Sequence, residues 1–123
     1  MMAKLMIVDD SNIIRTHIAR LMVDTRLPPI EVVGLASDGN KAVEMARTTR
    51  PDYITMDLTM PNMDGEACIE QIAGMLPDAK ILVVSALSDK ATALRAVTKG
   101  AHGFLQKPFT DESMVLSLLE LMS

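Results

Sequence analysis

The chain has 123 residues, 49% of them hydrophobic and 23% charged, which excludes a disordered segment, a collagen-like repeat and a disulfide scaffold. Twelve basic and sixteen acidic side chains give a net charge of −4, with no cluster of lysines or arginines, and this argues against direct nucleic-acid binding. The single cysteine, Cys68, suits a reducing compartment, and no apolar run approaches the ~20 residues that span a bilayer. We expect one cytoplasmic domain over residues 1–123, without membrane insertion or a further domain.

The first half of the chain alternates short apolar runs with amphipathic stretches. Residues 3–8 are mostly apolar and predict a strand that is covered on both faces. Asp10-Ser11 follows as a helix N-cap, ahead of apolar residues at helical spacing. Residues 30–36 predict the second strand, and the turn at 37–39 leads into a second helix, which Pro51 ends.

The second half continues the same alternation. Its predicted elements are, in order, a strand at 52–56, a helix after the loop 58–64, a strand at 80–84, a helix at about 89–99, a strand at 103–105 and a helix capped by Thr110. Five such units with short connections imply a doubly wound α/β fold, in which right-handed crossovers place helices on both faces of a parallel sheet.

Polar side chains follow the predicted strands where each one ends. The first strand ends in Asp9-Asp10, the third in Asp57 and the fourth in Ser85, and Lys107 follows the fifth strand. Because ligands of open α/β sheets bind beyond the carboxyl ends of the strands, we expect these side chains to form one site.

The chemistry of this set points to phosphoryl transfer. Most of these residues alone have an ordinary explanation: Asp9-Asp10 as a helix cap and its neighbour, Ser85 as a turn hydroxyl and Lys107 as a surface cation. Asp57 is the exception, because an ionised side chain that closes an apolar strand needs a partner. Together, three acids repel one another against one ammonium, so a hard divalent cation such as Mg²⁺ is expected among them. A metal, Lys107 and Ser85 match the three equatorial oxygens of a phosphoryl group, and a central carboxylate can be the nucleophile that forms an aspartyl phosphate.

Five motifs in this order and spacing resemble the response-regulator receiver domains of the CheY-like class, over the entire chain. The motifs are Val8-Asp9-Asp10-Ser11, the segment 56–65, Val84-Ser85-Ala86, Lys99-Gly100-Ala101 and the segment 104–109. The resemblance implies a flavodoxin-like fold with five helices and a five-stranded parallel sheet of order 2-1-3-4-5. It also implies a phosphoprotein of two-component signalling that assists its own phosphorylation and dephosphorylation but is not a dedicated enzyme.

The resemblance implies a role for each residue of the site. Asp57 would accept a phosphoryl group from a phosphohistidine of a histidine kinase or phosphotransfer protein. Mg²⁺ would be held by Asp10, Asp57 and the backbone carbonyl of Thr59, with Asp9 acting through a metal-bound water. Lys107, expected to precede a cis bond to proline, would pair with the phosphoryl group.

The resemblance also implies a switch. Ser85 would move to hydrogen-bond the phosphoryl oxygens, and Phe104, where many chemotaxis relatives have tyrosine, would turn inward. The surface formed by the fourth helix, fifth strand and fifth helix would then bind a downstream protein target. Thr59 and Leu87 would flank the phosphoryl group, and because Leu87 has no polar group to orient water, we predict slow self-dephosphorylation.

Two other classes of protein are disfavoured. A Mg²⁺-dependent phosphatase with an aspartate nucleophile needs a second acid where Thr59 stands, and a flavodoxin-like cofactor carrier needs a phosphate loop where Asp9-Asp10 stands. Chemotaxis or motility is the expected pathway. A phosphorelay intermediate, a phosphate sink and the excised receiver of a larger regulator stay open.

The expected target-binding surface does not identify its partner. Arg95 and Lys99 are four residues apart and predict a solvated, like-charged helix face, and His102 lacks metal-ligand spacing. We expect a monomer, with dimerisation on activation left open.

Overall fold

The computed structural model describes residues 2–87 and 89–123, and within them five strands alternate with five helices. The strands are β1 (Ala3–Val8), β2 (Ile30–Ala36), β3 (Tyr53–Met56), β4 (Lys80–Ser85) and β5 (Gly103–Gln106). The helices are α1 (Asn12–Leu21), α2 (Gly39–Thr49), α3 (Gly65–Met75), α4 (Lys90–Lys99) and α5 (Asp111–Met122). The predicted strands and helices are confirmed, with boundaries that shift by one or two residues.

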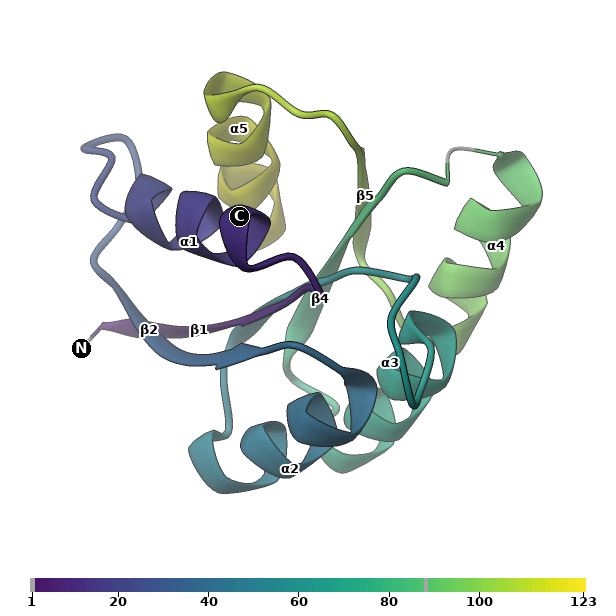
Figure 1. Ribbon diagram of the computed structural model, residues 1–123. Coiled ribbons are helices and arrows are strands. Elements are labelled where there is room, and N and C mark those ends of the chain that lie inside the picture. Colours follow the sequence, from purple (N-terminus) through teal and green to yellow (C-terminus); the bar gives the residue numbers. More distant parts are fainter. Residues whose placement is uncertain (1, 88) are drawn as a thin grey trace.

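The strands form one parallel sheet of order β2-β1-β3-β4-β5. Helices α1 and α5 cover one face of this sheet, and α2, α3 and α4 cover the other (Figure 1). The predicted doubly wound α/β fold and its strand order are therefore confirmed. Within the described residues, no helix is both long enough and apolar enough to cross a membrane.

Each face of the sheet has its own hydrophobic core. Along β1, Met6 and Val8 pack toward α2 and α3, whereas Leu5 and Ile7 pack toward α1 and α5. Successive side chains of a strand point to opposite faces, so a strand between two helical layers is apolar at nearly every position. Polar side chains are consequently placed where the strands end.

The helices begin at side chains that cap them. The N-cap residues are Ser11, Asp38, Asp64, Asp89 and Thr110, and each accepts a hydrogen bond from the backbone N–H three residues later. Helix α2 ends at Arg50, which adopts a left-handed conformation (φ 49°) ahead of Pro51. These local signals set the short connections that bring the strand ends together.

Cys68 lies on α3, in the core on the α2 and α3 side of the sheet, and it is fully buried. Burial raises the pKa of its thiol to about 12, so the side chain stays a neutral thiol. In this environment the side chain packs as part of the core.

Candidate functional site

The carboxyl ends of β1 and β3 hold two buried acids side by side. Asp9 directly follows β1, and Asp57 directly follows β3, with 1% and 4% of their surfaces exposed. The Asp57 N–H donates to the Val8 carbonyl at 2.9 Å, which extends the pairing of the two strands to this point. The parallel register therefore fixes the two carboxylates as neighbours.

A third acid completes a cluster. Asp9, Asp10 and Asp57 each offer a carboxylate oxygen, and these oxygens all lie within 4.8 Å of one another. Asp10 is exposed, so the cluster opens to solvent on its side. Carboxylate oxygens with room for water and a phosphate oxygen are the donor set that Mg²⁺ takes in proteins, so the residues present fit this ion.

Thr59 lies beside the acidic cluster, in the loop that follows β3. Its N–H donates to Asp57 Oδ1 at 3.3 Å, and the residue is exposed. The metal-ligating role of the Thr59 carbonyl stays a prediction.

Lys107 reaches into the cluster from the other side. Its Nζ donates to Asp9 Oδ2 at 2.7 Å and lies 3.6 Å from Asp57 Oδ1. The Lys107 N–H donates to the Ser85 carbonyl at 2.8 Å, and the predicted cis bond to Pro108 is confirmed. The ammonium is thus bonded to Asp9 and is close enough to Asp57 to meet a group bound there.

The electrostatics of the cluster favour an added cation. Burial raises the pKa of Asp57 to about 6, the negative charge of Asp9 adds to this effect, and the ammonium of Lys107 opposes it. One positive charge thus faces three carboxylates. A divalent ion would restore the balance and would favour the ionised form of Asp57, which is the form that can act as a nucleophile.

Ser85 and Phe104 occupy the two strands next to this cluster. Ser85 is 1% exposed, and its Oγ accepts a hydrogen bond from the Leu87 N–H at 3.0 Å. Phe104 pairs with Val83 across β4 and β5, and its partly buried ring packs against the core on the α3 and α4 side. Their switching roles stay predictions. Leu87 is 46% exposed, and its place beside the phosphoryl group also stays a prediction.

The loop between β3 and α3 is held by contacts at the start of α3 and at the start of α2. A Cβ added to Gly65 would lie 2.3 Å from the Asp57 carbonyl oxygen, and the Gly65 N–H donates to the Leu58 carbonyl at 2.9 Å. Asn62 adopts φ 71°, and its Nδ2 donates to Asp38 Oδ2 at 3.2 Å. The start of α3 and the start of α2 therefore both position this loop.

The predicted solvated face of Arg95 and Lys99 also carries ion pairs. The two side chains are 55% and 38% exposed, and they pair with Glu66 and Glu70 of α3, at N···O distances of 3.3 and 2.9 Å. Glu66 and Glu70 share the four-residue spacing of the two cations, and that match was the signal in the sequence. His102, as expected, has an ordinary structural role: its Nδ1 accepts a hydrogen bond from the Ile81 N–H at 3.1 Å.

Sequence reasoning also missed Arg15. Its guanidinium donates to the backbone carbonyl of Asp9 from α1. No local pattern marks this contact, which depends on how α1 packs beside β1.

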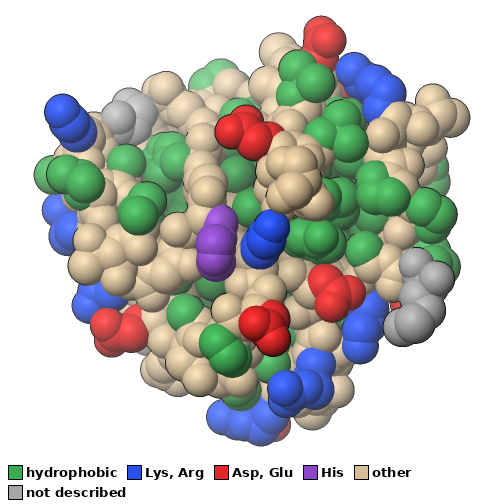
Figure 2. Space-filling view, turned by 180° about the vertical axis from the view of Figure 1, so that it is seen from behind, with side chains coloured by type: hydrophobic (Ala, Val, Ile, Leu, Met, Phe, Trp, Pro, Cys, Tyr) green, Lys and Arg blue, Asp and Glu red, His purple; other side chains and the backbone are tan. Residues whose placement is uncertain are grey.

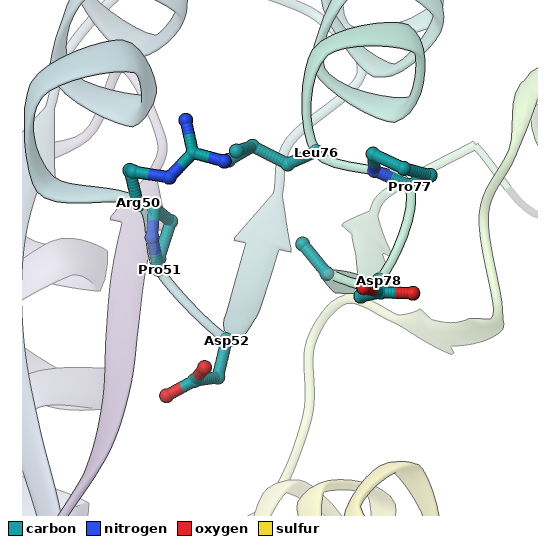
Figure 3. Close-up of a pocket in the computed structure, with 7 residues that line it drawn as sticks. Arg50, Pro51, Asp52, Leu76, Pro77 and Asp78 are labelled. Atoms are coloured by element: carbon teal, nitrogen blue, oxygen red, sulfur yellow. The ribbon is translucent and has the colours of Figure 1, made fainter.

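A separate cavity of about 200 Å³ lies between the loops that precede β3 and β4 (Figure 3). Its lining residues are Arg50, Pro51, Asp52, Leu76, Pro77, Asp78 and Ala79. These loops lead into the amino ends of the strands, whereas the acidic cluster lies at the carboxyl ends, so the two sites are at opposite edges of the sheet.

The surface opposite the view of Figure 1 mixes charges of both signs with apolar side chains. Figure 2 shows lysines and arginines interspersed with aspartates and glutamates over this face. A nucleic-acid site gathers its cations on one face or along one helix, and this face lacks that arrangement.

Comparison with known proteins identifies relatives along almost the whole chain. A family model described as the response regulator receiver domain matches residues 5–119. The chain is 38% identical over 117 residues to the chemotaxis protein CheY of Listeria monocytogenes, which covers 95% of this chain and 96% of that protein. It is 43% identical over 108 residues to protein-glutamate methylesterase/protein-glutamine glutaminase 3 of Myxococcus xanthus, covering 85% of this chain and 30% of that protein.

A solved structure extends the likeness to the fold. A chain of the CheX-CheY-BeF₃-Mg complex from Borrelia burgdorferi matches with a TM-score of 0.92 and 25% identity, covering 98% of this chain and 90% of that one. The sequence and structure comparisons point to the same kind of protein.

Proposed function

This chain belongs to the response regulator receiver domain family of two-component signalling, and from that premise we propose that it accepts a phosphoryl group on Asp57. The family is a CheY-like signalling module and not a dedicated catalyst, and its chemotaxis relatives link the chain to that pathway. The observation that carries the proposal is the buried Asp57 carboxylate, grouped with Asp9 and Asp10 within 4.8 Å and 3.6 Å from the ammonium of Lys107.

Each residue of the site has its own role in the proposed phosphoryl transfer. A carboxylate oxygen of Asp57 attacks the phosphorus of a phosphohistidine, the P–N bond breaks, and the imidazole leaves with the electron pair of that bond. Asp10, Asp57 and the Thr59 carbonyl would hold Mg²⁺, with Asp9 acting through water; the ion supplies positive charge against the phosphoryl oxygens. Lys107 and Ser85 would each bind a further oxygen.

The proposed output is a change of surface. Ser85 moves toward the bound phosphoryl group, and Phe104 turns further into the core, which reshapes the face formed by α4, β5 and α5. Phosphorylation would thereby shift the population of an existing two-state element. The partly buried ring of Phe104 supports this proposal, because it lies at the boundary between core and solvent.

The proposed partners are a histidine kinase or phosphotransfer protein on one side and a protein target of chemotaxis or motility on the other. The Borrelia burgdorferi structure is titled as a complex of CheX with CheY, which supports binding of a second protein by a relative of this chain. A phosphorelay intermediate is the second candidate, because a receiver that hands its phosphoryl group to another histidine needs the same site.

Intact mass spectrometry tests the proposal. The wild-type protein is incubated with acetyl phosphate and Mg²⁺, beside Asp57→Asn, beside an EDTA control and beside Asp78→Asn, which removes an exposed acid at the other edge of the sheet. We expect one added phosphoryl group in the wild type and in Asp78→Asn, and none in Asp57→Asn or with EDTA. An adduct that persists in Asp57→Asn contradicts the proposed acceptor.

A further inference from the structure

Two pairs of opposite charges join α3 to α4. Both carboxylate oxygens of Glu66 lie 3.3 Å from Arg95 Nε, and Glu70 Oε2 lies 2.9 Å from Lys99 Nζ. The two acids are four residues apart on one helix and the two cations are four residues apart on the other, so facing turns of the helices are matched.

The ion pair nearer to Asp57, between Glu66 and Arg95, continues into a hydrogen-bond network. Arg95 Nη2 donates to Thr92 Oγ1 at 3.2 Å, and Thr92 Oγ1 donates to Asp89 Oδ1 at 2.7 Å. The Thr92 N–H also donates to Asp89 Oδ2, at 3.0 Å, which is the N-cap bond of α4. Thr92 is 3% exposed, so the hydrogen-bond network is buried at this residue. The single hydroxyl of Thr92 serves as both donor and acceptor.

One end of the hydrogen-bond network reaches a segment that borders Asp57, and the other end reaches the N-cap of α4. Glu66 lies in the first turn of α3, directly after Gly65, which packs against the Asp57 carbonyl. Asp89 is the N-cap of α4.

We propose that Arg95 is a positioning residue, which ties the N-cap of α4 to the start of α3 and so holds the segment that packs against Asp57 in place for a phosphoryl group. This inference rests on the proposed function. Arg95 touches none of the groups expected to react; it acts through Thr92 and Asp89 on one side and through Glu66 on the other.

The guanidinium suits this role because it serves two partners at once. Its Nε faces Glu66 and its Nη2 faces Thr92, and the planar group fixes the angle between the two bonds. An ion pair as exposed as this one contributes little free energy. The expected effect of breaking it is therefore a roughly two- to fivefold weaker affinity for the ligand, and not a loss of binding.

Beryllofluoride with Mg²⁺, a phosphoryl analogue, serves as the probe. The chain has no tryptophan, so binding is followed by amide NMR shifts of the full chain. We expect Arg95→Gln to weaken the apparent affinity two- to fivefold, by the ion-pair argument above. Arg95→Lys should recover part of this loss, since an ammonium still reaches Glu66 but does not bridge both partners. Arg47→Gln, which removes a pair with Glu44 on α2, should leave the affinity unchanged.

A double-mutant cycle separates positioning from a general loss of charge. Glu66→Gln should weaken binding as Arg95→Gln does, and the double variant should weaken it no further. Wild-type affinity in both folded single variants overturns the inference while the proposed function stands. A wild-type chain that does not bind beryllofluoride overturns the proposed function itself. If Arg95→Gln fails to fold, Glu66→Gln carries the test.

Discussion

Asp57 lies where its carboxylate can react, but its surroundings disfavour the negative charge of that carboxylate. Burial and the neighbouring charge of Asp9 raise its pKa to about 6, and Lys107, bonded to Asp9, offsets this only in part. At neutral pH the carboxylate is therefore mostly ionised, as a nucleophile must be, but the folded chain holds that charge at a cost in stability.

The first prediction is that Asp57→Asn stabilises the chain above pH 6. The pKa of Asp57 is about 6 in the folded chain and near 3.8 in the unfolded chain, so the folded state binds more protons between these values. The free energy of unfolding contributed by this group therefore falls as the pH rises from about 4 to about 6. At pH 7.5 without metal, the variant should be more stable by up to about 3 kcal/mol, and this gain should vanish near pH 4.

Urea unfolding in EDTA at several pH values measures this difference. Asp78→Asn is the matched control, because it removes an exposed carboxylate far from the cluster and should change stability little at any pH. A stability gain in Asp57→Asn of equal size at pH 4 and pH 7.5 would show that the charge of Asp57 is not its cause.

At the scale of the element, α3 offers a matched pair of glycines. Gly65, at its first residue, leaves no room for a Cβ, which would lie 2.3 Å from the Asp57 carbonyl and 2.5 Å from the Leu58 Cα. Gly74, near its end, has no neighbouring atom within 4 Å of an added Cβ. The helix therefore packs tightly against the site at Gly65, whereas Gly74 has open space around it.

The second prediction is that the same substitution has opposite effects at these two positions. Gly65→Ala should lower the free energy of unfolding by roughly 1–3 kcal/mol, because rigid backbone must move. Gly74→Ala should raise it by up to about 1 kcal/mol, because alanine favours the helix over the unfolded chain more than glycine does. Denaturant unfolding of both variants compares the two effects directly. A Gly65→Ala variant as stable as the wild type would refute the close approach of α3 to Asp57.

The elements that the sequence predicted best are those with local signals. The helix start at Thr110 was recognised, and the start of α1 was placed at Asp10-Ser11, because a capping side chain acts on the three residues that follow it. The pairing of Glu66 with Arg95 was not predicted. The matched four-residue spacing is visible in the sequence, but which helices face each other depends on how α3 and α4 pack.

At the scale of the whole molecule, the site is assembled by topology. Asp9 and Lys107 are 98 positions apart in the chain and form a 2.7 Å hydrogen bond, because β1 and β5 both end at the same edge of a parallel sheet. Strand alternation was enough to predict that edge, but the strand order rested on the resemblance to a family. Neither the strand alternation nor the resemblance predicted which acid Lys107 contacts, because side-chain packing decides it.

The third prediction concerns magnesium and the whole fold. The cluster of Asp9, Asp10 and Asp57 joins the ends of β1 and β3 and exists only in the folded chain, so a bound ion stabilises folding by mass action. At a free Mg²⁺ concentration ten times the dissociation constant, the free energy of unfolding should rise by about 1.4 kcal/mol. Because protons compete for Asp57, with its pKa of about 6, the rise should be smaller at pH 5 than at pH 7.5.

Thermal unfolding with and without Mg²⁺, at constant ionic strength, measures this effect. Asp10→Asn is the informative variant, because Asp10 is exposed and belongs to the cluster, so its replacement should remove most of the stabilisation while leaving the metal-free protein folded. An equal Mg²⁺-dependent rise in Asp10→Asn and in the wild type would mean that the ion acts on the surface charge as a whole. A rise confined to the chain with all three acids places the ion at the carboxyl edge of the sheet, where Lys107 and Ser85 meet.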